Sequence, residues 1–267
     1  MPAIATLERL ILRDRLVMGM GLAAITALAW MYLAREAAGM SAMAEEAGMH
    51  AAMGMADPRA WGLTDWFWLF VMWAVMMVAM MLPSAAPVMV LVLGVYRRRA
   101  DHQARLAAAS FVGGYVIVWA AFSVAASAAQ VALHQAAVLA PDMRVRSGAI
   151  SGGLLLIAGI YQWLPLKQAC LAHCQSPLGF LSQHWREGAA GGLLLGMRHG
   201  AFCVGCCWLL MTLLFVVGVM NLVWVAALTA FVLIEKLARQ GAVVGRVAGA
   251  AVAAWGVYLV ASAFIVS

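Results

Sequence analysis

A group of thiols and one imidazole lies inside an apolar stretch of the chain, GMRHGAFCVGCCWLLM (196–211). Cys203 follows His199 by four residues, and Cys206 and Cys207 follow Cys203 by three and four, so on an α-helix the group lines one face. Thiolate and imidazole ligands suit Cu(I) and Zn(II) and suit Mg²⁺ or Ca²⁺ poorly. The spacing favours a soft-metal site. Ordinary buried cysteines and a redox pair of Cys203 and Cys206 are the alternatives.

A second, smaller group lies in YQWLPLKQACLAHCQSP (161–177), where Cys170, His173 and Cys174 are close neighbours. Two thiols and one imidazole do not complete a tetrahedral metal shell by themselves. A site that exchanges ions with the first group and a span end anchored by Lys167 explain the segment equally well.

Methionine is the third chemically suggestive residue type, with 19 copies in the chain. The stretch FVMWAVMMVAMMLPSAAP (70–87) carries two rows of methionines at four-residue steps: Met72, Met76 and Met80 in one row, and Met77 and Met81 in the other. Thioethers bind Cu(I) without losing a proton and discriminate against harder divalent ions. Methionine also fills gaps in helix bundles, and the sequence favours copper only slightly over that structural role.

Spaced methionines recur in GMSAMAEEAGMHAAMGMADP (39–58), which includes Met49, His50 and Met53. We expect this segment to belong to a Met/His-rich loop over 35–64, outside the membrane. Thioethers tolerate an oxidising compartment that attacks thiols, and all five cysteines fall on the opposite, cytoplasmic half of the predicted topology. This division between thioethers and thiols is the best sequence argument for a copper path.

The elements that must position these groups are membrane helices. Hydrophobic residues make up 66% of the chain, charged residues 10%, and the mean hydropathy is +0.94, which excludes an ordinary soluble domain. We predict an all-α, polytopic membrane bundle that forms one domain over 1–267, with a lipid bilayer as its solvent. About seven spans fit, at 16–34, 66–94, 106–130, 148–164, 200–220, 222–235 and 243–265.

The distribution of cations orients this bundle. With a cytoplasmic N-terminus, only four of the 17 lysines and arginines lie outside, namely Arg35, Arg59, Arg144 and Arg146. The residues 165–187 then form a cytoplasmic Cys/His loop, and the prokaryotic cytoplasmic membrane is the expected location. The net charge of +6 sits at span ends, without the aromatic interleaving of a nucleic-acid surface, so no nucleic-acid partner is expected.

Glycines at four-residue spacing indicate close helix packing. Gly188, Gly192, Gly196 and Gly200 form one such stripe, and a second one runs from Gly241 to Gly249. In a bilayer, small residues let two helix backbones approach closely. We expect each stripe to pack on a neighbouring helix of the chain or of another subunit.

Several of these motifs together resemble a known family. WAVMMVAMMLPSAAP, YQWLPLKQACLAHCQSP, the first glycine stripe, CVGCCWLLM and the pair Glu235–Lys236 are similar to the DUF2182 family of predicted metal-binding integral membrane proteins, some of which are labelled copper chaperones. The resemblance covers about residues 65–240. It implies a copper-linked membrane protein and brings no established mechanism.

The leading hypothesis is a membrane protein that handles Cu(I), with Zn(II) as the other candidate ion, for transport or for delivery to a membrane cuproenzyme or copper carrier. The runners-up are a membrane thiol–disulfide oxidoreductase and a structural or assembly subunit. The sequence favours a non-enzymatic role without deciding it. Glu235 is expected to be an ion-pair anchor beside Lys236 rather than a proton-coupled carboxylate.

Overall fold

The computed structural model describes residues 2–52, 62–99, 103–140 and 143–266, with side chains from residue 12 onward except at 41–48, 50–52 and 266. Within these residues the chain is helical apart from its connections, and the one β-bridge joins Leu139 to Val145. The predicted all-α, polytopic bundle is confirmed. In chain order the helices are α1 (Pro2–Ala52), α2 (Leu63–Arg98), α3 (Ala104–Gln135), α4 (Gly148–Tyr161), α5 (Pro165–Gln175), α6 (Pro177–His184), α7 (Gly188–Thr212), α8 (Leu214–Val217), α9 (Leu222–Leu237) and α10 (Gly241–Val266).

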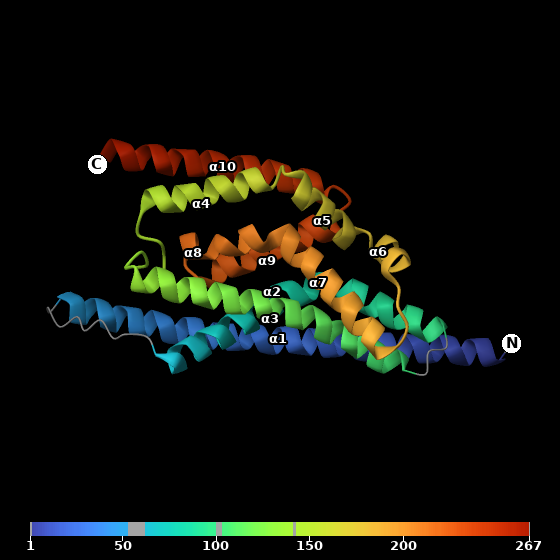
Figure 1. The fold of residues 1–267 in the computed structure, drawn as a ribbon. Coiled ribbons are helices and arrows are strands. Elements are labelled where there is room, and N and C mark those ends of the chain that lie inside the picture. The colour runs from blue at the N-terminus through green and yellow to red at the C-terminus, as the bar shows by residue number, and fades with distance from the viewer. Residues whose placement is uncertain (1, 53–61, 100–102, 141–142, 267) are drawn as a thin grey trace.

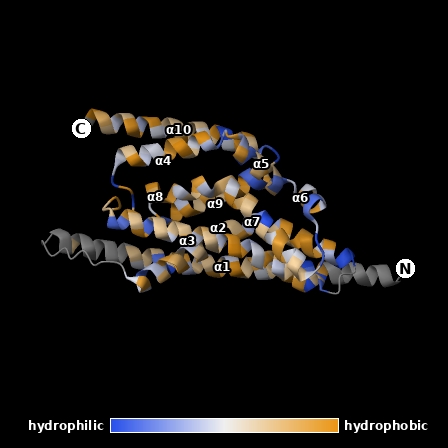
Figure 2. Cartoon of the chain, in the orientation of Figure 1, coloured by the Kyte–Doolittle hydropathy of each residue, from blue (hydrophilic) through white to orange (hydrophobic). Residues whose placement is uncertain are grey.

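The helices form two outer groups with a pair of helices between them (Figure 1). Helices α1, α2 and α3 run side by side, α4 and α10 run together on the opposite side, and α7 and α9 lie between these two groups. The closest pairings are α7 with α3, α10 with α4, and α2 with both α1 and α3. Figure 2 shows apolar residues along the helix bodies and hydrophilic ones near helix ends and around α5.

Five segments are long and apolar enough to cross a membrane, and α4 with α5, bent by 62°, counts as a sixth when it is taken as one broken span. The expected span at 222–235 is α9, whose 16 residues extend about 24 Å at 1.5 Å per residue, short of a full crossing. The seventh span is therefore not shown.

Three predicted boundaries differ from the structure. Residues 35–52, expected in an outer loop, continue helix α1, and the expected loop at 165–187 contains the short helices α5 and α6. The span expected to begin at residue 200 begins at Gly188, because the glycine-rich segment continues as helix α7. Glycine disfavours an isolated helix, and close tertiary packing compensates for that cost here.

That packing is visible at the glycines of α7. A Cβ at Gly196 would lie 2.7 Å from the carbonyl carbon of Phe111, and one at Gly192 would lie 2.9 Å from that of Ala107. Real Cβ atoms essentially never show such distances, so only glycine permits this approach of α7 to α3. The predicted close packing occurs within the chain. Gly188 meets nothing within 4 Å, and its φ of 71° marks the turn into the helix.

One ionic cluster ties three helices together at the N-terminal end of the bundle. The buried carboxylate of Asp14 on α1 forms ion pairs with Arg97 at the end of α2 and with Arg105 at the start of α3, the latter at 2.8 Å. These cationic segments lie on one side of the bundle, as the predicted topology requires.

Candidate metal centre

Helix α7 carries the predicted thiol and imidazole group into the centre of the bundle. The side chains of His199, Cys203, Cys206 and Cys207 are only 1–2% exposed. The Sγ atoms of Cys206 and Cys207 donate to the carbonyl oxygen of Cys203 at 3.1 and 2.9 Å. All five cysteines are free thiols, so Cys203 and Cys206 form no disulfide in this structure.

The methionine rows and the thiols meet at one position. The Sγ of Cys207 lies 3.9 Å from the Sδ of Met81, which joins α7 to α2. Met76, Met77 and Met80 are fully buried on the same helix. Among the described contacts, Met81 is the methionine of these rows that touches a thiol, so the two motifs form one sulfur cluster only there.

Lys236 on α9 also enters this cluster. Its Nζ donates to the Sγ of Cys203 at 2.9 Å, to the Oγ of Ser84 at 3.1 Å, and lies 4.0 Å from the Sδ of Met81. The residue is 6% exposed. Sequence reasoning treated Lys236 only as a neighbour of Glu235, although a lysine within an apolar stretch is itself a signal of function.

Tyr115 on α3 also contacts the cluster. Its hydroxyl lies 3.0 Å from the Sγ of Cys203 and donates to the carbonyl oxygen of Met81 at 3.2 Å. The His199 ring stands between aromatic rings, with centroids 5.9 Å from Tyr115 and 5.2 Å from Phe180. Its Nδ1 is buried without a hydrogen-bond partner. This nitrogen is an unused ligand atom on the same helix as the thiols.

The second predicted group is divided by the structure. Cys174 is buried and lies near Cys206, at the border of the sulfur cluster. Cys170 is only partly buried and its Sγ lies against Gly205. The His173 ring instead stacks on Phe202, 4.1 Å between centroids, and its Nδ1 bonds to the carbonyl oxygen of Ala169.

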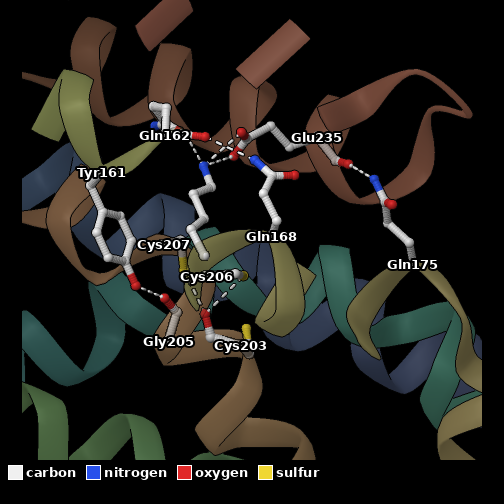
Figure 3. A network of polar contacts seen from close by, with 10 residues as sticks. Tyr161, Gln162, Gln168, Gln175, Cys203, Gly205, Cys206, Cys207 and Glu235 are labelled. Carbon is white, nitrogen blue, oxygen red and sulfur yellow. Dashed lines mark hydrogen bonds and ion pairs between the residues drawn. The ribbon is translucent and has the colours of Figure 1, made fainter. Parts of the chain in front are cut away.

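A separate polar layer lies next to the sulfur cluster, at the break between α4 and α5 (Figure 3). Lys167, fully buried, donates to both carboxylate oxygens of Glu235 at 2.7 and 2.9 Å, and also to Gln162. The amide of Gln175 donates to the backbone oxygen of Glu235. Glu235 is thus an ion-pair partner, as expected, and its partner is Lys167 rather than its neighbour Lys236. Adjacent residues point about 100° apart on a helix, which separates the two side chains.

The methionine-rich segment at 39–58 contributes little to the described structure. Met49, on α1, is 58% exposed. The side chain of His50 and all of Met53 lie outside the described residues.

No three histidine, cysteine, aspartate or glutamate side chains are placed to hold a metal ion within the part of the chain that the structure describes. The cluster instead combines thiols, one thioether, a phenol and an ammonium group within contact distance. Binding a metal ion there requires some side-chain rearrangement. The donor chemistry nevertheless fits a soft ion and no hard one.

Comparison with known proteins bears on this chemistry. The family model PpoB2, described as a copper chaperone, matches residues 70–259. The chain belongs to this copper chaperone family. The match begins within α2 and includes both methionine rows, both cysteine groups and Lys236, whereas Met49, His50 and Met53 precede it. The expected kinship to copper chaperones is confirmed; the DUF2182 name remains a resemblance. No curated protein and no solved structure matches the chain.

Proposed function

We propose that this member of the copper chaperone family is an integral membrane protein that binds Cu(I) between α2 and α7 and passes it to a membrane cuproenzyme or copper carrier. The observation that carries the proposal is the contact between Cys207 and Met81, 3.9 Å between sulfurs in the core of the bundle. It brings the thiol motif and the thioether motif together in one place, and both ligand types suit a soft monovalent ion.

The surroundings of the cluster support the same ion. Cys203, Cys206 and Cys207 are buried among apolar helices, where water and hard, strongly hydrated cations are excluded. Thiolates and a thioether match the softness of Cu(I), and the unpaired Nδ1 of His199 offers a further nitrogen ligand. Zn(II) shares thiolate and imidazole ligands and is the competing ion.

The wider path is part of the proposal. The exposed Met49 and its neighbours capture copper at the outer face of a prokaryotic cytoplasmic membrane. The buried rows of α2, which include Met76, Met77 and Met80, connect that face with the thiol cluster. In this proposal Cys170 and His173 exchange the ion with the cluster from its cytoplasmic side.

The test is metal binding by the purified full-length protein in detergent, without oxygen. Cu(I) is titrated against a chromophoric Cu(I) chelator, first with the wild type and then with a variant in which Cys203, Cys206 and Cys207 are serine. We expect about one tightly bound Cu(I) in the wild type and its loss in the variant. Met211→Leu, another buried sulfur residue on α7, is the matched control and is expected to keep the ion.

Two results would overturn the proposal. One is a wild-type protein that fails to compete with the chelator. The other is a metal-free protein in which Cys203 and Cys206 form a reversible disulfide, which would favour the thiol–disulfide oxidoreductase instead.

A further inference from the structure

The sulfur cluster contains a fixed positive charge, the ammonium group of Lys236. The Nζ touches the thiol of Cys203, the hydroxyl of Ser84 and, at the edge of contact, the thioether of Met81. These are the atoms among which a Cu(I) ion is expected to bind. A cationic side chain is an unexpected neighbour for a cation site, because it opposes metal binding.

Within the described part of the chain, no carboxylate lies within ion-pair distance of this ammonium. Glu235, the nearest carboxylate in the sequence, gives both its oxygens to Lys167 on α5. Among the described residues, Lys236 forms no ion pair with a carboxylate; its hydrogen-bond partners are sulfur and hydroxyl groups. The proposed metal ligand closest to this positive charge is the sulfur of Cys203, at 2.9 Å.

The fold also keeps the ammonium in place. Lys236 is 6% exposed and lies one residue from Glu235, which is held by Lys167 and through its backbone by Gln175. On a protein surface a lysine side chain would swing into water when a metal ion arrived. Here the surrounding helices leave the charge close to whichever ion is bound.

We propose that Lys236 is the residue that selects monovalent copper over divalent ions in this cluster, an inference that rests on the proposed function. Repulsion by a fixed charge is proportional to the charge of the incoming ion, so Zn²⁺ is opposed twice as strongly as Cu⁺. A fixed positive charge in a buried site therefore adds more to the cost of holding Zn²⁺ there than to the cost of holding Cu⁺. The preference arises from charge, in addition to ligand softness.

The test compares two ions in two variants of the full chain in detergent, without oxygen. Affinities for Cu(I) and Zn(II) are measured by chelator competition in the wild type, in Lys236→Gln and in Lys236→Arg. We expect the glutamine variant to raise the affinity for Zn(II) relative to Cu(I) by at least about tenfold. The arginine variant keeps the charge and is expected to keep the wild-type ratio. Lys236→Leu repeats the measurement if the glutamine variant does not fold, as judged by gel filtration.

The two proposals fail in different ways. A wild-type protein without Cu(I) affinity overturns the proposed function, and the selectivity of Lys236 with it. A wild type that binds Cu(I), together with an unchanged Zn(II)-to-Cu(I) ratio in the glutamine or leucine variant, overturns only the role of Lys236. Met89→Leu, buried elsewhere on α2, serves as the control for unspecific effects of a core substitution.

Discussion

Replacing Gly196 by alanine is the sharpest test of how the bundle positions its thiols. The new Cβ would lie 2.7 Å from the carbonyl carbon and 2.9 Å from the Cα of Phe111 on α3. Ordinary van der Waals contact begins at 3.4 Å, so α3 and α7 must move apart by more than half an ångström. No side-chain rotation relieves the clash, since the opposing atoms belong to the backbone.

The expected cost follows from this geometry. Overpacking that forces backbone shifts in a tight interface destabilises a protein by about 1–3 kcal/mol. Gly192 and Gly114 make equally close approaches along the same pair of helices. Moving α3 and α7 apart at Gly196 therefore also loosens their contacts at these two glycines. The same movement carries Tyr115 away from the thiol of Cys203, which now lies 3.0 Å from its hydroxyl. We therefore expect lower stability and weaker Cu(I) binding together.

The assay is thermal unfolding followed by circular dichroism in detergent, combined with Cu(I) competition. Gly113→Ala is the matched control on α3, because a Cβ there meets nothing within 4 Å. Alanine is a better helix former than glycine by about 1 kcal/mol, so this control is expected to be neutral or stabilising. Equal melting temperatures for Gly196→Ala and Gly113→Ala would refute the reasoning that the stripe sets the separation of α3 and α7.

Three further predictions follow from the site. Met81→Leu should weaken Cu(I) binding by at least about tenfold while Met89→Leu, buried on the same helix, leaves it unchanged; equal titrations would remove Met81 from the cluster. Lys167→Met should lower the free energy of unfolding, measured by chemical denaturation, by about 3–5 kcal/mol, because Glu235 loses its buried partner. The double variant Lys167→Met with Glu235→Gln should recover part of this loss, because the unpaired carboxylate is gone. A maleimide reagent should label Cys170 faster than the buried α7 thiols in native protein, and uniform labelling rates would contradict their burial.

The sequence by itself determined the class of the fold and the chemistry of the ligands. Long apolar stretches can satisfy their backbone groups in lipid only as helices, so a helical bundle followed from composition. The four-residue spacing of Gly192 and Gly196 indicated a close approach of two backbones, and the structure shows it. The residue types of the thiol and methionine motifs suggested a soft ion, and the copper chaperone family agrees with copper.

Only the tertiary structure shows which helix faces pack against each other. Helical periodicity assigns residues to a face, but it does not say which face of another helix will pack on it. The contact of Met81 with Cys207 and the separate partners of Glu235 and Lys236 therefore could not be read from spacing. The same holds for Tyr115, an ordinary tyrosine in the sequence, which becomes a neighbour of Cys203 only because glycines bring α3 against α7.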